Sequence, residues 1–310
     1  MTMPPAPARR VVLLINPAAG RHDPAGLDRL VEALRRRGLE AEIVVGRSPG
    51  DLAARAAASE ADIVAVSGGD GTVNDVVGTL ASRTGRRPLL AVIPAGTANV
   101  LAHEHRLPTA PEAIAAAIAA GRTRPLHLGT ARSDGEAARP FVLMASAGLD
   151  AAIVHAVERR RPRRFKKLVF VVEALRRVFA ARPRLVAEIE TEAGERLRID
   201  CALAIVAKAA HYGGPHRLTV ATASERPGLR FVALLDDRPS RLAEAAARLA
   251  VGRLEGSANV VSLAVTRVRL TAAAGADAPV QIDGEPHGTT PIEVWASPAA
   301  LDLIVAADPV

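Results

Sequence analysis

Short apolar runs alternate with segments of helical periodicity over the first 121 residues, and no other feature of the sequence constrains the fold as strongly. The apolar runs are residues 11–15, 41–45, 62–66 and 89–93, and the helical segments are residues 27–37, 51–59, 74–80 and 111–120. Strands that alternate with helices at this spacing form βαβ units, and such units build a parallel sheet. We therefore expect an α/β domain with a parallel sheet at residues 1–128.

Helical segments become rare after about residue 125, so the rest of the chain is expected to form a mostly antiparallel, sandwich-like β domain. The expected strands are residues 141–145, 185–190, 197–207, 217–221, 229–235, 260–270 and 280–282, and the expected helices are residues 168–180 and 241–249. We place this β-rich domain at residues 129–299. The polar, turn-rich stretch 121–140 is expected to hold the boundary, and the tail 300–310 is expected to pack back on the first domain.

The chain carries a net charge of +7, which favours anionic partners such as a nucleotide, nucleic acid or an acidic lipid surface. Seven of the ten residues between Glu158 and Lys167 are basic, and Phe165 is the one aromatic residue among them. A surface that stacks nucleic-acid bases needs more aromatic side chains. We therefore expect no nucleic-acid partner.

Cys201 is the one cysteine of the chain, which excludes an intrachain disulfide and a Cys-rich zinc site. It stands in an apolar run and is expected to pack as a small hydrophobic residue. No segment approaches 18 uncharged apolar residues, and the first ten residues contain no apolar core of a signal peptide. A cytoplasmic location is expected.

A glycine-rich segment directly follows the third apolar run, where residues 67–74 read Ser-Gly-Gly-Asp-Gly-Thr-Val-Asn. Glycine lets the backbone bend sharply and approach a ligand closely, and successive N–H groups can surround an anion. Asp70 would repel a bare phosphate, so its partner would be a metal ion carried by the phosphate. The segment therefore suggests a Mg-nucleotide loop and phosphoryl transfer, and an ordinary tight turn is the alternative.

Two further turns follow other expected strands. Residues 16–20 read Asn-Pro-Ala-Ala-Gly after the first strand, and residues 94–99 read Pro-Ala-Gly-Thr-Ala-Asn after the fourth. Ligands of parallel sheets bind beyond the carboxyl ends of the strands. The three turns are therefore expected to converge on one site.

Two later segments, Gly-Leu-Asp at residues 148–150 and Asp-Gly-Glu at residues 283–285, complete an ordered set of five motifs. With these motifs, the sequence resembles the diacylglycerol kinase catalytic-domain family, which includes bacterial soluble lipid kinases and sphingosine kinases. The resemblance covers nearly the whole chain from about residue 11. It implies an ATP-dependent kinase that phosphorylates a hydroxyl of a diacylglycerol-like or related lipid. It also implies a nucleotide-binding domain, a β-rich lipid-substrate domain and a cleft between them.

The resemblance implies roles for residues of the motifs. The residues that would contact the nucleotide are Asn16, Pro17, Gly20, Gly68, Gly69, Asp70, Gly71, Thr72, Asn74, Gly96, Thr97 and Asn99. Asp70 would also face Mg²⁺, which prefers carboxylate and phosphate oxygens. Asp283 or Glu285 would be the general base that accepts the proton of the lipid hydroxyl, and we favour Glu285 slightly. By itself, Asp-Gly at residues 283–284 also fits a plain hairpin turn.

The sequence departs from the family pattern at several positions. Val100 stands where the family often has Asp, and Asp75 replaces the usual Glu after Asn74. Many bacterial members bind a structural Mg²⁺ through an Asp-Asp-Gly segment, but residues 225–228 read Glu-Arg-Pro-Gly here. Whether a structural Mg²⁺ site is retained stays open, and the displaced acids argue against it. Asp70, Asp283 and Glu285 are all present, so activity is expected.

Two other functions compete with the lipid kinase. An NAD kinase-like enzyme would share the Gly-Gly-Asp-Gly-Thr loop, but residues 94–99 and 283–285 match the lipid kinases better. A non-catalytic nucleotide- or lipid-binding regulator with the same fold is the third hypothesis, supported by Val100 and the changes at residues 225–228.

The basic stretch from Arg159 to Lys167 precedes an apolar segment that is expected to be helical. A cationic stretch beside an apolar helix can dock on an anionic bilayer, which would bring a lipid kinase to its substrate. We therefore expect a lipid partner and a peripheral position at the inner face of the membrane. A solvated basic loop is the alternative, and the formation of a homodimer stays open.

Overall fold

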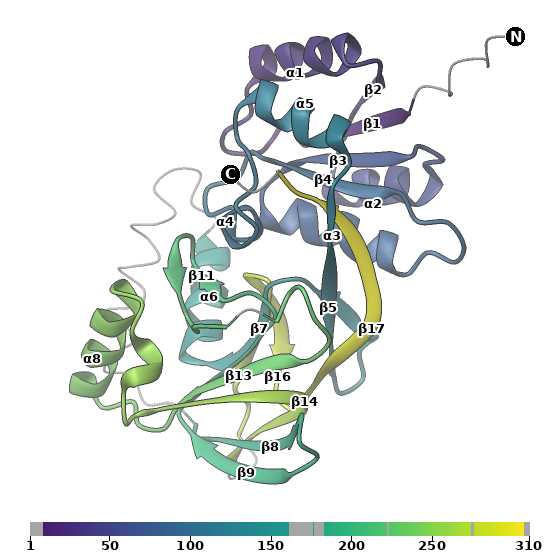
Figure 1. Cartoon of the computed structure of the whole chain (residues 1–310). Coiled ribbons are helices and arrows are strands. Elements are labelled where there is room, and N and C mark those ends of the chain that lie inside the picture. Colours follow the sequence, from purple (N-terminus) through teal and green to yellow (C-terminus); the bar gives the residue numbers. More distant parts are fainter. Residues whose placement is uncertain (1–8, 161–175, 177–182, 222, 274–275, 307–310) are drawn as a thin grey trace, which may run out of the picture. The chain divides into compact units, whose positions relative to one another are not determined.

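The computed structural model describes residues 9–160, 176, 183–221, 223–273 and 276–306 (Figure 1). The chain divides into two compact units, the first made of residues 1–126 and 299–310 and the second of residues 127–298. Within the described residues, no helix has both the length and the apolar character needed to cross a membrane.

The first unit is built on a parallel sheet with the strand order β2-β1-β3-β4. These strands are β1 (Arg10–Ile15), β2 (Glu40–Val45), β3 (Ile63–Gly68) and β4 (Leu89–Pro94). The C-terminal end of β17 (Ile292–Ile304) joins β4 in parallel, where Leu303 lies opposite Leu90. The sheet confirms the expected α/β class of the N-terminal part.

Helices cover both faces of this sheet (Figure 1). They are α1 (Pro24–Arg36), α2 (Pro49–Ala58), α3 (Asp70–Ala81), α4 (Val100–Glu104) and α5 (Pro111–Ala120). Alternate residues of β1, such as Leu13, pack with α1 and α5 in one apolar cluster, whereas α2 and α3 pack together on the other face. Because side chains of a strand alternate between its faces, a run that is apolar throughout can bury both faces under helices.

The glycine-rich segment is not a loop followed by a helix at residue 74. Strand β3 extends to Gly68, Gly69 is the N-cap residue, and α3 already begins at Asp70. The prediction relied on apolar periodicity, which starts only at Val73. An acidic residue in the first turn of a helix is favourable beside its unpaired N–H groups, so Asp70 fits this position. The short helix α4 was also not predicted.

The second unit is a mostly antiparallel sheet assembly, as expected, with the order β16-β15-β7-β10-β13-β14-β17. Its strands are β5 (Thr123–Ser133), β6 (Arg139–Phe141), β7 (Met144–Gly148), β8 (Leu185–Thr191), β9 (Arg196–Cys201), β10 (Leu203–Ala207), β13 (Leu229–Leu234), β14 (Val260–Ala272), β15 (Pro279–Ile282), β16 (Glu285–Thr289) and β17, with a separate small ribbon of β11 (His211–Tyr212) and β12 (His216–Arg217). Further pairs form between β8 and β14, β8 and β9, β5 and β17, and β5 and β6. One apolar cluster, which includes Phe141 and Phe231, is the core of this unit, and Cys201 is buried in it as a free thiol.

Several expected elements of the second unit differ from the structure. The expected single strand 197–207 is two strands, β9 and β10, which are separated at Ala202. The expected strand at residues 217–221 is reduced to the end of β12. Strands β5, β16 and β17, the helix α6 (Leu149–Arg160) and the 3-10 turn η1 (Leu254–Gly256) were not predicted. The expected helix 168–180 lies outside the described residues except for Arg176, which is helical.

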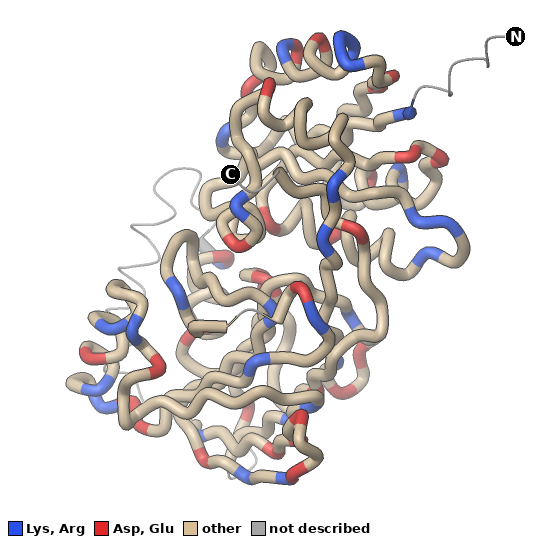
Figure 2. Tube along the Cα trace, in the orientation of Figure 1, with Lys and Arg blue, Asp and Glu red and all other residues tan. Residues whose placement is uncertain are grey.

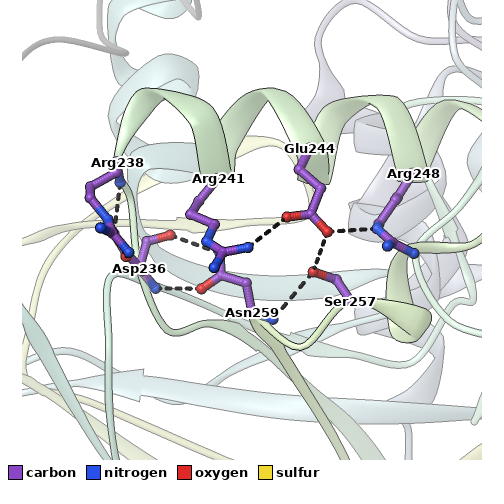
Figure 3. A network of polar contacts seen from close by, with 7 residues as sticks. All are labelled: Asp236, Arg238, Arg241, Glu244, Arg248, Ser257 and Asn259. Carbon is purple, nitrogen blue, oxygen red and sulfur yellow. Dashed lines mark hydrogen bonds and ion pairs between the residues drawn. The ribbon is translucent and has the colours of Figure 1, made fainter.

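Helix α8 (Pro239–Ala250) is held by a polar network that Figure 3 shows. The Glu244 carboxylate accepts hydrogen bonds from Arg241 (3.0 Å), Arg248 (2.8 Å) and the Ser257 hydroxyl (3.1 Å). Asn259 donates to the Asp236 carbonyl (2.9 Å) just before the helix. Figure 2 shows acidic and basic residues close together along this helix, and the network accounts for them as partners within the second unit.

Candidate functional site

The turns after β1, β3 and β4 lie together at the carboxyl edge of the first unit's sheet. Asn16 N donates to Ser67 O (2.9 Å) and Arg21 N donates to Ala95 O (2.8 Å). The Asn16 side chain donates through Nδ2 to Thr72 Oγ1 (2.7 Å), and its Oδ1 accepts from Ala18 N (3.0 Å). The three turns that the sequence analysis singled out are therefore neighbours in space.

Glycine is required where two of these turns approach each other. A Cβ atom on Gly96 would lie 2.5 Å from Gly69 Cα, a distance that real Cβ atoms do not show. A Cβ on Gly68 would lie 2.7 Å from Thr72 Cβ, and one on Gly20 would lie 3.4 Å from Thr97 Oγ1. The edge is consequently lined by closely packed backbone, which can present N–H groups to a ligand.

Asn99 and Asn74 have different surroundings. Asn99 has a left-handed backbone (φ 48°), and its amide closes the turn by accepting from Gly96 N (2.8 Å) and donating to Gly96 O (3.0 Å). Asn74 is buried in α3, and its Oδ1 has no hydrogen-bond partner among the described residues. Pro17 is exposed in the first turn, and Gly71 is half-buried in the first turn of α3.

Asp70 connects the start of α3 with the start of α4. Its Oδ1 accepts a long hydrogen bond from Leu101 N (3.4 Å). Burial raises the pKa of Asp70, and the backbone N–H groups of Leu101, Val100 and Asn99 oppose that rise. A half-buried carboxylate in the first turn of a helix provides oxygen atoms for a hard cation, because Mg²⁺ is commonly held by one or two carboxylates together with phosphates.

A hairpin between β15 and β16 carries the candidate bases of the second unit. Its two turn residues, Asp283 (φ 49°) and Gly284 (φ 83°), both have positive φ, as a tight two-residue hairpin requires. The buried Asp283 carboxylate accepts hydrogen bonds from the backbone N–H groups of Val142 (2.9 Å), Leu143 (2.9 Å) and Met144 (2.8 Å). Burial raises the pKa of Asp283 to about 6 against these three donors. Asp283 therefore attaches the hairpin to the segment that leads into β7.

Glu285, the first residue of β16, has a more open environment. Its carboxylate is about half exposed and pairs with Arg139 Nη2 at 2.7 Å. The Glu285 carboxylate is thus accessible from solvent, whereas the Asp283 carboxylate is already occupied by backbone donors. Arg139 was not identified in the sequence analysis, because a single arginine before β7 gives no recognisable pattern.

A buried polar network is hydrogen-bonded to the turn of this hairpin. The Asp150 carboxylate accepts hydrogen bonds from the hydroxyls of Ser146 and Tyr212. Gln281 Nε2 donates to Asp150 Oδ2 (3.0 Å) and Ser146 Oγ (2.9 Å), which turns Gln281 Oε1 toward Gly284 N (2.7 Å). The motif at residues 148–150 is thereby linked to the motif at residues 283–285.

The predicted site residues therefore form two groups, each within one unit. The first contains the residues of the three turns and Asp70, and the second contains Asp283 and Glu285. Asp150 belongs to a motif that is recognisable in the sequence but had no predicted role, and Gln281, Ser146 and Tyr212 were not predicted from the sequence. The only signal for Gln281 is a polar residue inside the apolar strand β15.

Comparison with known proteins identifies two family domains along the chain. Residues 10–131 match the profile of the diacylglycerol kinase catalytic domain, and residues 143–305 match that of the YegS C-terminal NAD kinase beta sandwich-like domain. The chain belongs to the diacylglycerol kinase catalytic-domain family.

Curated relatives of this family member include a diacylglycerol kinase of Mycobacterium tuberculosis, which is 29% identical over 306 residues and covers 95% of this chain and 94% of its own length. A diacylglycerol kinase of Bacillus subtilis is 28% identical over 189 residues, or 59% of each chain. Among solved structures, a diacylglycerol kinase from Bacillus anthracis has a TM-score of 0.69 at 17% identity, with 96% of this chain and 97% of that chain covered. An NAD kinase from Archaeoglobus fulgidus, solved in complex with ATP, has a TM-score of 0.55 at 15% identity and covers 96% of this chain and 94% of its own. These two structures show a shared fold.

Proposed function

We propose that this member of the family is an ATP-dependent lipid kinase that transfers the γ-phosphate to a hydroxyl of a diacylglycerol-like or related lipid. The main support is the start of α3, where Gly68 and Gly69 lead directly into a helix that begins with Asp70. The N-terminus of a helix offers unpaired N–H groups to phosphate, and a glycine backbone allows close approach. The names of the curated relatives favour a lipid over other acceptors.

In this proposal, the residues of the three turns bind ATP. Thr97 and Asn16 supply polar side chains beside the glycine backbone, and Asp70 would hold Mg²⁺ together with the phosphates. The ion would supply neutralisation of phosphate charge. Phosphoryl transfer requires mainly positioning and such neutralisation, so a rigid backbone cradle with one carboxylate suits it.

Glu285 is the proposed base in the second unit. Its carboxylate is accessible, and it would accept the proton of the lipid hydroxyl as the oxygen attacks the γ-phosphorus. Arg139 keeps the Glu285 side chain in place through their ion pair. Asp283 acts as a positioning residue, because its carboxylate binds three backbone N–H groups and fixes the hairpin.

Incubation with labelled ATP, Mg²⁺ and a panel of diacylglycerol, phosphatidylglycerol, sphingosine, ceramide and NAD tests the proposal. We expect label in a lipid, lost in the Asp70→Ala and Glu285→Ala variants. Label in NADP instead would support the NAD kinase-like alternative, which the fold shared with the Archaeoglobus fulgidus enzyme keeps open. ATP binding without transfer to any acceptor would support a non-catalytic regulator.

The lipid substrate suggests a peripheral association with an anionic membrane through the stretch from Arg159 to Lys167. Apart from Arg159 and the helical backbone of Arg160, this stretch lies outside the described residues. Reversal of the charges of Arg160, Arg161, Arg163 and Arg164 should reduce binding to anionic vesicles in a flotation assay. Unchanged binding would refute this docking stretch and leave the kinase assignment untouched.

A further inference from the structure

Lys208 is a lysine in the interior of the second unit. It directly follows β10, and only 1% of its surface is exposed. Lysine is almost never fully buried unless its ammonium group has partners, because removal of a charge from water is costly. The chain contains three lysines among its 40 basic residues, so a lysine at this position departs from a strong preference for arginine.

The ammonium group of Lys208 binds the loop that precedes β13. Its Nζ donates to Arg226 O (2.9 Å) and Gly228 O (2.8 Å), while Lys208 O accepts from Ala223 N (2.9 Å). Burial, together with the nearby charge of Arg226, lowers the pKa of Lys208 to about 7. The two carbonyl oxygens that face the nitrogen favour its charged form. A compact cation thus lies among backbone carbonyls, an arrangement that also suits a metal ion.

This loop contains residues 225–228, which stand where many bacterial family members carry the Asp-Asp-Gly segment of a structural Mg²⁺ site. The donors present here do not fit such an ion. The carbonyl oxygens of Arg226 and Gly228 already accept from Lys208, and the nearby Glu192 carboxylate pairs with Arg226 Nη1 at 2.7 Å. Among the described residues, no group of three or more His, Cys, Asp or Glu side chains could hold a metal.

We propose that the Lys208 ammonium replaces the structural divalent cation, so that the loop at residues 223–228 is held by a cation built into the chain. A lysine suits this role better than an arginine, because an ammonium is a compact point charge whereas a guanidinium is a planar fork. The second unit consequently needs no structural metal for its stability. This inference does not rest on the proposed kinase activity.

The backbone of Lys208 is also linked to the hairpin of β15 and β16, which carries Asp283 and Glu285. The backbone N–H groups of Lys208 and Ala209 donate to Leu143 O (2.8 Å and 3.1 Å). Leu143 N in turn donates to the Asp283 carboxylate at 2.9 Å. Loss of the Lys208 cation is therefore expected to disturb the loop first and, through residue 143, the hairpin.

Thermal unfolding of the nucleotide-free full-length chain, treated with a chelator, tests the proposal. The melting temperature of the unaltered protein should not change when millimolar Mg²⁺ or Ca²⁺ replaces the chelator. Lys208→Met keeps the length of the side chain but leaves both carbonyls without the cation, and should lower the melting temperature by about 4 °C or more. The Lys208→Arg variant should also melt at a lower temperature than the unaltered chain, because a guanidinium does not replace the ammonium group between the two carbonyls.

Arg226→Met is the matched control, since it removes a cation from the same loop but not the one that binds the carbonyls. Its melting temperature should stay near that of the unaltered chain. A divalent ion that stabilises both the unaltered chain and Asp70→Ala would overturn the proposal, and so would a Lys208→Met variant that is as stable as the unaltered chain. If Lys208→Met does not fold, the metal titration of the unaltered chain and the metal content of the purified protein still decide the question.

Discussion

Asp283 and Glu285 are two residues apart, but their carboxylates have opposite surroundings. Asp283 is buried and accepts three backbone N–H groups, whereas Glu285 is half-exposed and pairs with a guanidinium. A general base has to come within hydrogen-bond distance of the proton that it accepts. The sequence left Asp283 and Glu285 nearly equal as candidates for the general base. The exposure of the Glu285 carboxylate favours Glu285.

The raised pKa of Asp283 predicts a pH dependence of stability that Asp283→Asn lacks. This pKa is about 6 in the folded chain, against 3.8 for an unperturbed carboxyl, so the folded chain binds more protons than the unfolded chain between these values. The contribution of Asp283 to the free energy of unfolding therefore falls as the pH rises from about 4 to about 6, by up to about 3 kcal/mol. Chemical denaturation of the unaltered chain and of Asp283→Asn between about pH 4 and about pH 6 measures the difference between their free energies of unfolding. If the advantage of the unaltered chain stayed constant or grew as the pH rises, the raised pKa of Asp283 would be contradicted.

Two buried polar residues show what the sequence does not reveal at this scale. Gln281 lies within an apolar strand, and Lys208 ends another apolar run. In the sequence each resembles an isolated polar residue on a strand, which is usually exposed. Their partners, Gly284 and Asp150 for Gln281 and the carbonyls of a loop for Lys208, are set by the fold and leave no local pattern.

At the scale of elements, local signals predicted helices well where they were present. Helix α5 has the expected bounds, because Pro111 starts it and Gly121 ends it with a left-handed backbone (φ 63°). Helix α3 begins earlier than expected, because its first turn consists of glycines and polar residues that fit a loop equally well. The split of residues 197–207 into two strands has no glycine or proline to mark it.

The close approach of the turns after β3 and β4 predicts the effect of Gly96→Ala. The added Cβ would lie 2.5 Å from Gly69 Cα, so the start of α3 has to move away from the turn. We expect weaker ATP binding by about tenfold or more and a loss of about 1–3 kcal/mol in stability. Calorimetric titration with Mg-ATP and thermal unfolding measure both effects.

Gly50→Ala is the control for this substitution, because a Cβ on Gly50 would meet no atom within 4 Å. It should bind ATP as the unaltered chain does. Equal ATP affinity of Gly96→Ala and Gly50→Ala would show that the two turns do not form the nucleotide site.

The hairpin of β15 and β16 depends on the amide of Gln281. Gln281→Leu removes the hydrogen bond to Gly284 N and leaves the Asp150 carboxylate without that donor. We expect kcat to fall by about tenfold while the KM for ATP stays unchanged, because the substitution disturbs the orientation of Glu285 and leaves the first unit intact. Gln281→Glu keeps an acceptor for Gly284 N but places a carboxylate beside Asp150, so it should not restore activity at neutral pH. A proportional change in both kinetic constants would argue against a positioning role.

At the scale of the whole chain, the alternation of strands and helices correctly predicted a parallel α/β part followed by a mostly antiparallel β part. The signal is strong because it repeats, and each repeat is read from contiguous residues. Strand β17 was missed because its partners are remote in sequence: it pairs with β14 near residue 294 and with β4 at Leu303. Pairing over such separations depends on the packed structure and is not encoded in a local period.

The division of the site residues between two units predicts that nucleotide binding and proton removal can be lost separately. Glu285→Gln alters no residue of the first unit, so it should bind Mg-ATP with an unchanged Kd while kcat falls by about 100-fold or more. Asp70→Asn should instead weaken Mg-ATP binding, since it removes the proposed metal ligand.

Glu293→Gln is the matched control, because Glu293 is another ion-paired glutamate of the second unit, bound to Arg132 and Arg269. This variant should keep kcat within about twofold of the unaltered chain. Titration calorimetry and initial rates with diacylglycerol measure the two properties. A Glu285→Gln variant that loses ATP affinity, or one that retains full turnover, would refute this separation of roles.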